Sequence, residues 1–562
     1  MNEAPPRRRR ERLVLALSFV LFSCIALGIA GRDLAVPGLY YDEVIQAEPA
    51  VQFLADDGRP SRIPGARTTR LFGGWFPVMI QPYMGALKSH ALMPVFAAFG
   101  ATAASLRLTT LAWSLVGLLF AMLWAREALG TRVAIVAGVL LAVDPSFLWT
   151  SRHDWGSFAL GFLCRCAGLY FVTTGWNRRT AWRLFAGGLC FGLGVYNKID
   201  FGVFVAAAGL ALAMAFPQIV SETLRTRGLR PLPAALGFLL GAGPMIAAAG
   251  AVLAATQHVV RRQAEVSGDW AEKLHAFVAV LDGSYFHKLI LAGGSFERMF
   301  EAPGAEMGRL FLVAFLACGV VLGAQLLRDR RRDELDPAQS FVWLATLAIA
   351  LGIFLTPRAV RIHHTLNLYP FPQLVVAVAL VRLWEGAPAG GPARLLRRVG
   401  AATVLCAVSA GSLYVNFRSF ETIRESGGKG RWSDTLGAFA AELASQPGAA
   451  AVSLDWGFDG PLRYAARDLA LVEPIWKIRR GHLPGHAWTF AGTPQHVYLV
   501  FEEDLAVFDF GPEFLAMARD MTPDDVSIRR HLDREGDLAF LSVRFARPHQ
   551  LTYAGEFEVR MR

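Results

Sequence analysis

The sequence predicts a polytopic α-helical membrane protein that ends in a small soluble α/β domain. Of its 562 residues, 54% are hydrophobic and only 18% are charged, a composition typical of membrane proteins. Apolar runs that reach or approach a spanning length of roughly 17 residues or more recur through most of the chain. Toward the C-terminus they give way to shorter runs. We therefore predict a membrane domain over residues 1–417 and a soluble domain over residues 418–562.

The membrane domain contains about eleven predicted spans. The first, Leu13–Ala30, follows a cluster of arginines but has no convincing small-residue cleavage site, so we interpret it as a retained signal anchor. The later predicted spans are Leu106–Trp124, Val133–Trp149, Trp155–Thr174, Trp182–Tyr196, Phe201–Phe216, Leu232–Ala255, Leu310–Leu327, Phe341–Leu355, Leu368–Leu383 and Ala401–Val415.

The arginines predict the orientation of these spans. Arg-rich short loops mark the cytoplasmic side, and alternate loops are Arg-rich if the N-terminus is cytoplasmic. The moderately apolar stretch Trp75–Phe99, which contains three prolines, must then lie along the outer surface as short helices, because another crossing would invert every later loop. Residues 32–105 thus form one long outer loop. An odd number of spans places the soluble domain on the same outer side.

The soluble domain alternates short β-like runs with helix-like stretches. Its predicted strands are Ala450–Trp456, Leu469–Ile475, His496–Phe501 and Ala539–Phe545, and its predicted helices include Thr435–Leu443 and Glu513–Met521. All six cysteines of the chain lie within apolar runs, so disulfides are not expected. Because much of the arginine that contributes to the +10 net charge lies in the short loops, a nucleic-acid partner is not expected either.

Two groups of ionisable residues lie on the predicted outer side. Asp42 and Glu43 follow Tyr40 and Tyr41 shortly after the first span, where a carboxylate can act as a base toward a substrate in the adjacent leaflet. The short outer loops contain Asp144, Arg152, His153, Asp154, Arg358, Arg361, His363 and His364. Outer loops are normally poor in arginine, so this cationic cluster suits the phosphate of a lipid carrier. Lys198 is interpreted as an anchor to lipid headgroups, with contact to phosphate as the alternative, and Asp200 is its expected partner.

These features resemble the GT-C superfamily of integral-membrane glycosyltransferases, in particular the branch of protein O-mannosyltransferases and aminoarabinose transferases. The resemblance rests on Asp42-Glu43, Ala47-Glu48, the in-plane stretch Pro77–Gly85, Asp144-Pro145, and the Arg/His loop that precedes Leu368–Pro372. It implies an enzyme of the cell membrane, typically a bacterial inner membrane. Such an enzyme moves a hexosyl or pentosyl group from a polyprenyl-phosphate donor to a protein, lipid or glycan acceptor, with inversion.

The resemblance also implies roles for individual residues. Asp42 is the expected general base, with Glu43 beside it as a supporting catalytic group. The expected phosphate-binding residues are Arg152, Arg361, His363, His364, Arg358 and Lys88, and the supporting ones are Asp154, Tyr41 and Asp144. The chain lacks the lysine beside consecutive prolines found in aminoarabinose transferases and has Lys88 instead. No resident cofactor or metal is expected, although Asp42, Glu43 and Asp154 offer the hard oxygen ligands that Mg²⁺ or Mn²⁺ prefers.

Three other functions remain open at this point. A transporter or flippase for a lipid-linked substrate would place ionisable residues at mid-membrane, whereas these spans are nearly free of charge, with Arg165 as the main exception. A lipid-linked glycan polymerase or ligase would share the topology and the donor. A noncatalytic scaffold would leave the outer carboxylates and arginines without a substrate, since exposed carboxylates and snorkelling arginines are common near membranes.

Overall fold

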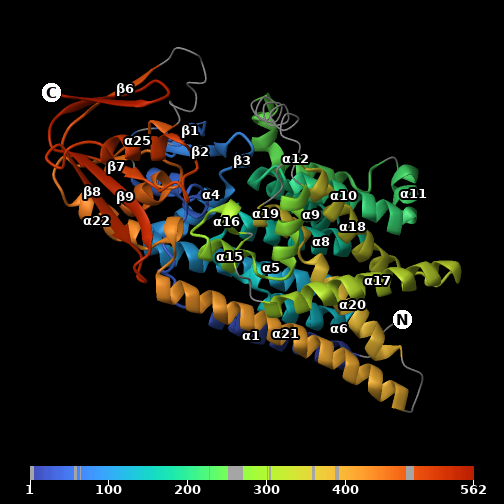
Figure 1. Ribbon diagram of the computed structural model, residues 1–562. Coiled ribbons are helices and arrows are strands. Elements are labelled where there is room, and N and C mark those ends of the chain that lie inside the picture. Colours follow the sequence, from blue (N-terminus) through green and yellow to red (C-terminus); the bar gives the residue numbers. More distant parts are fainter. Residues whose placement is uncertain are drawn as a thin grey trace.

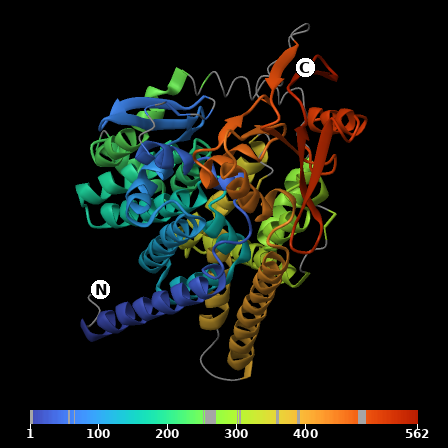
Figure 2. The same ribbon diagram turned by 90° about the vertical axis from the view of Figure 1, so that its left-hand side faces the viewer.

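The computed structural model describes residues 5–562 except 56–57, 59, 62, 64, 227, 251–252, 254–269, 300, 303–305, 357–360, 387–391 and 476–486. It consists of a helix bundle with a strand-containing region, residues 427–562, at one face (Figure 1). We call these residues the C-terminal region. Figure 2 shows that helices α1 (Pro5–Ala30) and α21 (Pro392–Ser426) extend away from this region, and α21 leads directly into it.

Within the described residues, each of the eleven predicted spans overlaps a helix or a bent helix pair, and residues 251–252 and 254–255 of the span Leu232–Ala255 lie outside the described residues. Besides α1 and α21, the helices that correspond to predicted spans are α5 (Ala103–Leu129), α6 (Thr131–Val143) with α7 (Pro145–His153), α8 (Phe158–Asn177), α9 (Ala181–Asn197), α10 (Phe201–Ala215), α12 (Leu232–Ala247), α17 (Arg309–Arg331), α18 (Pro337–Leu355) and α20 (Phe371–Glu385). Among the described residues, seven helices are long and apolar enough to cross a membrane, or nine if each bent pair is one span. Helices α9 and α12, with 17 and 16 residues, are shorter. The chain is a multi-pass membrane protein.

Glycines bring α9 and α12 into close contact. A Cβ added at Gly188 would lie 1.9 Å from the backbone oxygen of Ala234, and one at Gly237 would lie 2.1 Å from that of Phe185. Small residues spaced four apart let helix backbones approach in this way and pack through van der Waals contacts. This packing fixes α9, whose C-terminal end precedes Lys198.

The expectation of short helices over residues 75–99 is only partly correct. The chain forms strands β1 (Arg67–Leu71), β2 (Gly74–Gln81) and β3 (Met84–Gly85), which pair as one antiparallel sheet, and α4 (Leu87–Phe99) follows. Phe72 and Gly73 both have positive φ, the geometry of a tight hairpin turn, and glycine adopts it without strain. The helical expectation is wrong for 75–85 because the preceding strand β1 supplies backbone hydrogen bonds there through a hairpin.

The C-terminal region contains a five-stranded mixed sheet and a smaller three-stranded sheet. The larger sheet has the order β5 (Ala470–Val472), β4 (Ala450–Ser453), β7 (His496–Val500), β9 (Leu538–Phe545) and β8 (Val526–Leu532), with β4 parallel to both of its neighbours. Helices α22 (Thr435–Ala444), α23 (Asp459–Ala465) and α25 (Phe510–Arg519) accompany it. The second sheet joins β11 (Phe557–Met561), β10 (His549–Tyr553) and β6 (Trp488–Gly492). All four predicted strands are confirmed.

A cluster of buried charges joins the C-terminal region to the segment between α1 and α5. Arg463 of α23 contacts Glu48, the first residue of α3 (Glu48–Ala55), at 3.1 Å, and Asp459 at 2.7 Å. It also contacts Glu473 at 2.5 Å. Burial and the neighbouring Glu473 raise the pKa of Asp459 well above its ordinary value. One guanidinium therefore holds three carboxylates from both parts of the chain.

Replacement of Arg463 by Lys is expected to loosen this contact. A lysine keeps the charge but cannot reach three carboxylates with a planar fork, so about 2 kcal/mol of charge-assisted hydrogen bonding is lost. Hydrogen exchange of α23, together with thermal unfolding of the purified protein, measures the effect. Arg529→Lys is the control, because Arg529 is mostly exposed and pairs with Glu442 alone. Equal effects of the two variants would contradict the prediction.

Candidate functional site

Asp42 lies in α2 (Tyr41–Val44), a single helical turn, and its carboxylate is held by one hydrogen bond. The indole Nε1 of Trp155 donates to Asp42 Oδ2 at 2.5 Å. No described residue donates a hydrogen bond to Oδ1. Burial raises the pKa of Asp42, and the Trp155 hydrogen bond and the charges of Lys198, Arg361 and Lys88 oppose that rise. Asp42 is thus a half-buried carboxylate with one oxygen available and cations around it.

Glu43, the neighbour of Asp42, is locked in a buried ion pair. Arg107 Nε lies 2.6 Å from Glu43 Oε1, and Nη2 lies 2.9 Å from Oε2. His153 Nδ1 is 3.6 Å from Oε1. Burial alone would raise the pKa of Glu43, but the charge and hydrogen bonds of Arg107 lower it well below its ordinary value. Glu43 therefore stays ionised and fixes α2, so its position suits a supporting role better than proton transfer.

Lys88 and Asp154 form a second buried pair beneath α2. Lys88 Nζ lies 2.9 Å from Asp154 Oδ2 and donates to the backbone oxygen of Glu43 at 3.0 Å. Asp154 Oδ1 accepts from the backbone N–H of Ala159 in the first turn of α8. The Lys88 side chain is 0% exposed, and the Asp154 side chain is 1% exposed. Because protein oxygens enclose the Lys88 ammonium, this packing disfavours the donor-phosphate role predicted for it.

Arg152 is also buried and engaged by the backbone. Its guanidinium donates to the carbonyls of Arg32 and Asp33 at 2.8 Å, to Ala30 at 3.2 Å, and to Val36. It thereby satisfies carbonyl groups at and beyond the C-terminal end of α1, which have no partner within the helix. The predicted phosphate role for Arg152 does not fit this position.

Asp144 and Tyr41 also have local packing roles. Asp144 lies where α6 and α7 meet at an angle of 62° and caps α7 by accepting from the backbone N–H of Phe147 at 2.9 Å. It also accepts from Tyr369 and Gln373, which ties α20 to the bend. Tyr41 is buried against Trp456 of the C-terminal region, with ring centroids 4.8 Å apart. Both residues support the site without facing it as reactive groups.

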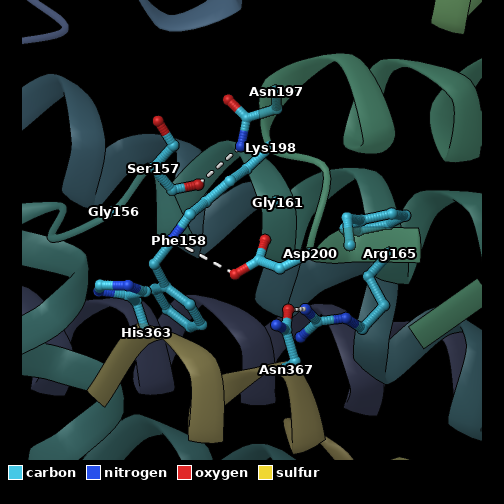
Figure 3. A pocket seen from close by; sticks show the side chains of 11 residues that line it. Gly156, Ser157, Phe158, Gly161, Arg165, Asn197, Lys198, Asp200, His363 and Asn367 are labelled. Carbon is cyan, nitrogen blue, oxygen red and sulfur yellow. Dashed lines mark hydrogen bonds and ion pairs between the residues drawn. The ribbon is translucent and has the colours of Figure 1, made fainter. Parts of the chain in front are cut away.

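A polar pocket contains a second set of charged residues (Figure 3), and one of them, Lys198, acts electrostatically on Asp42. Lys198 Nζ is 3.3 Å from Asp200 Oδ2, and His364 Nδ1 is 3.1 Å from the same oxygen. Arg165 donates to Asn367 at 2.7 Å. The pocket encloses about 270 Å³ of space, part of it open to solvent, and its lining residues are Gly156, Ser157, Phe158, Gly161, Arg165, Asn197, Lys198, Asp200, Phe201, His363 and Asn367. The predicted pairing of Lys198 with Asp200 is confirmed.

The charges of this pocket reach Asp42. Burial would raise the pKa of Asp200, but Lys198 and His364 lower it well below its ordinary value, so Asp200 stays ionised. Tyr83, in the β2–β3 turn, has its pKa raised to about 12 by burial and by the charges of both Asp42 and Asp200. Its backbone oxygen accepts from Ile199 at 3.0 Å. The Lys198–Asp200 pair and Asp42 therefore belong to one electrostatic site.

Both histidines of the predicted Arg/His loop lie at the pocket: His363 lines it, and His364 contacts the lining residue Asp200. Gly156 has a positive φ of 67°, and a Cβ there would lie 2.6 Å from His363, so only glycine allows this packing. His363 Nδ1 is buried without a hydrogen-bond partner among the described residues. Arg361 is partly exposed, 3.9 Å from Glu272, and close enough for its charge to act on Asp42. Arg358 lies outside the described residues.

The carboxylates proposed as metal ligands do not form a cation site as arranged. Both oxygens of Glu43 are bonded to Arg107, and both oxygens of Asp154 have partners. Within the described part of the chain, the one group of three His, Cys, Asp or Glu ligands within 4.8 Å is Asp533, Glu535 and Asp537. Lys429 already pairs with two of these.

The sequence predicts Lys198 chiefly as a headgroup anchor and only secondarily as a phosphate contact, although a cation on the predicted outer side is the same signal that indicates Arg152 as a phosphate ligand. The sequence does not indicate a role for Trp155, because that role depends on a contact with Asp42, 113 positions away.

Part of the sequence matches a known family. Residues 84–248 match the model of the dolichyl-phosphate-mannose-protein mannosyltransferase family. The match begins beyond Asp42 and includes Lys88, Asp154 and the Lys198–Asp200 pair. A comparison with curated protein sequences gives no match.

The structure resembles solved membrane enzymes over most of its length. ArnT from Cupriavidus metallidurans bound to undecaprenyl phosphate has a TM-score of 0.52 and 14% identity, over 93% of this chain and 97% of that chain. The Archaeoglobus fulgidus oligosaccharyltransferase in its apo form has a TM-score of 0.52 and 13% identity, over 92% of this chain and 69% of that one. Its complex with an acceptor peptide containing the NVT sequon, tethered via a disulfide bond, has a TM-score of 0.51 and 14% identity, with the same coverage. The chain thus has the fold of the GT-C integral-membrane glycosyltransferases, and its residues 84–248 match the mannosyltransferase family within it.

Proposed function

We propose that the protein is an inverting glycosyltransferase that moves a sugar from a polyprenyl-phosphate donor to an acceptor, with Asp42 as general base. The observation that carries this proposal is the half-buried Asp42 carboxylate beside a pocket that contains Lys198 and the unpaired Nδ1 of His363. A base and an anion-binding group in one site are what a displacement at a sugar phosphate requires. The GT-C fold supports the same reaction class.

The donor phosphate is best accommodated at Lys198. Its ammonium has a single carboxylate partner, Asp200, which it shares with His364. Arg361 is partly exposed, and its charge, like that of Lys198, acts on Asp42. ArnT of similar fold has been crystallised with undecaprenyl phosphate, which supports a lipid phosphate as the ligand here.

The reaction proceeds as one displacement. Asp42 Oδ1 accepts the proton of an acceptor hydroxyl or amine, whose oxygen or nitrogen forms a bond to the anomeric carbon. The bond between that carbon and the phosphate oxygen breaks, and the electron pair leaves with the lipid phosphate, whose charge Lys198 and Arg361 stabilise. The attack from the opposite face inverts the anomeric carbon. Positioned general-base catalysis of this kind contributes about a hundredfold to ten-thousandfold.

The orientation in the membrane follows from the same proposal. Lipid-linked sugars of this type are used away from the cytoplasm, so the face that carries Asp42 and the C-terminal region is extracytoplasmic and the N-terminus is cytoplasmic. The arginines of alternate loops support this orientation. Cysteines introduced at Ser433 and Arg179 should then be labelled from outside and inside, respectively, by a membrane-impermeant reagent in sealed vesicles. The reverse labelling would refute the orientation.

The test of the function supplies the purified full-length protein with a panel of radiolabelled polyprenyl-phosphate sugars and candidate acceptors. Consumption of a donor with release of polyprenyl phosphate supports the proposal, and the labelled product identifies the acceptor. Failure to consume any donor refutes it. A lengthened lipid-linked glycan as product would favour the polymerase alternative, and donor that crosses sealed vesicles unchanged would favour the flippase alternative.

Replacement of Lys198 by Gln is expected to weaken lipid-phosphate binding about 10-fold to 100-fold. The variant removes one charge-assisted hydrogen bond to the phosphate, worth about 1.5–3 kcal/mol. The affinity for undecaprenyl phosphate, measured with the purified protein, tests this. Lys429→Gln is the matched control, because Lys429 is bound to Glu535 and Asp537 in the C-terminal region. An unchanged affinity of the Lys198 variant would place the phosphate elsewhere.

A further inference from the structure

Trp155 is the one described residue that bonds directly to the Asp42 carboxylate. The Nε1–Oδ2 distance is 2.5 Å, within hydrogen-bonding range. The Trp155 side chain is 1% exposed, so water does not compete for this bond. An indole donates one hydrogen bond and accepts none, so it can favour only the acceptor form of a carboxylate oxygen.

The turn that carries Trp155 is conformationally unusual. Asp154 and Ser157 have φ values of 42° and 60°, and Gly156 between them has 67°. Positive φ at a residue other than glycine costs about 1–3 kcal/mol and persists only where the surroundings impose it. Here the Lys88 ion pair holds Asp154, and Asn197 donates to the backbone oxygen of Ser157 at 2.9 Å. The strained turn is therefore anchored on both sides of Trp155.

Among the residues that the structure describes, at least three aromatic rings help to fix the plane of the indole. Its edge-on contacts are with Tyr40 at 5.2 Å, Trp432 at 5.5 Å and Tyr285 at 6.2 Å between ring centroids. Tyr40 is itself stacked on Trp432 at 4.2 Å with an interplanar angle of 7°. Tyr40 precedes the helix of Asp42, whereas Trp432 belongs to the C-terminal region. The ring of Trp155 is thus held by both parts of the chain that meet at the site.

We infer that Trp155 is a positioning residue that aims Asp42 and sets its basicity, an inference that rests on the function proposed above. The N–H holds Oδ2 so that Oδ1 alone is presented to the acceptor. By favouring the ionised carboxylate, it also keeps Asp42 able to take a proton in a site whose burial would otherwise keep it protonated. Neither effect requires Trp155 to touch the substrate.

The variant Trp155→Phe keeps an aromatic ring but removes the N–H. Because the protonated Asp42 cannot act as a base, turnover falls as the pH drops through its pKa, and loss of the hydrogen bond moves that fall to higher pH. We expect the acid limb of the kcat profile to shift upward by about one pH unit, the equivalent of about one charge-assisted hydrogen bond. The KM for the donor should stay within about twofold.

A purely structural role would give a different result. Loss of packing would lower kcat at all pH values or reduce the folded fraction, with the acid limb unmoved, and that outcome overturns the inference. Trp456→Phe is the matched control, because Trp456 packs against Tyr40 and Tyr41 without an Asp42 hydrogen bond. If Trp155→Phe does not fold, 3-benzothienylalanine at position 155, which replaces only the N–H by sulfur, decides the question. An inactive wild-type protein would instead refute the proposed function.

Discussion

Replacement of Asp42 by Asn is expected to lower kcat about 10²-fold to 10⁴-fold, the usual contribution of a positioned general base. Asparagine is nearly isosteric, and its amide oxygen can still accept the Trp155 hydrogen bond seen at 2.5 Å. Binding of undecaprenyl phosphate should therefore remain within about twofold of wild type. The residual activity should also lose its acid limb, because the amide does not titrate. Steady-state kinetics across pH measure both effects.

The control for Asp42→Asn is Asp504→Asn. The Asp504 carboxylate is 74% exposed in the C-terminal region and pairs with Arg298, so its neutralisation should leave kcat unchanged. An Asp42 variant as active as wild type would show that another group takes the acceptor proton. A variant that loses lipid-phosphate binding would show that Asp42 acts in donor binding instead.

Replacement of Arg107 by Met is expected to destabilise the protein by about 3–5 kcal/mol, the cost of leaving a buried charge without its partner. The guanidinium is fully buried and, besides Glu43, binds the carbonyls of Leu34, Pro37 and Gly38. Its loss therefore frees both the carboxylate beside Asp42 and the chain that leads to it. Thermal unfolding in detergent measures the loss.

The Glu43–Arg107 pair also permits a test of coupling. Glu43→Gln alone should cost less than Arg107→Met, because an amide still accepts hydrogen bonds from the guanidinium. The double variant Glu43→Leu with Arg107→Met should be less destabilised than the sum of its single changes, since neither partner is left charged and alone. Strict additivity would mean that the two side chains do not stabilise each other. Arg529→Met, at an exposed pair, is the reference for a surface change.

The membrane helices were predictable because hydropathy is local. Each predicted span corresponds to a helix, although α9 and α12 are shorter than a typical span. The helix prediction for residues 75–85 is wrong because composition does not determine their structure. It suits an interfacial helix as well as a strand, and pairing with β1 decides between the two. The sequence analysis does not predict the strands β6, β8, β10 and β11, of which β6 has its partner β10 far along the chain.

The site was predictable where charge alone identifies it. Asp42 and Glu43 are adjacent and chemically alike, yet Arg107 forms an ion pair only with Glu43. The sequence around positions 42 and 43 does not indicate this partner. Arg152 stood out correctly as a cation on the predicted outer side, but its partners are backbone carbonyls after α1. The sequence shows where charge is placed. The tertiary contacts decide whether a charged side chain pairs with groups of the protein or can bind a ligand.

The stack of Tyr40 on Trp432 bears on how the chain can be divided. Trp432 follows the last membrane helix by six positions, and its ring lies against Tyr40, the residue that precedes the Asp42 helix. A cut near residue 417, where the composition changes, would remove this ring from the membrane part. Chimaeras that exchange C-terminal regions between relatives should therefore keep residues 427–434 with the helix bundle. The junction of such a chimaera therefore lies after residue 434 and not near residue 417, where hydropathy would place it.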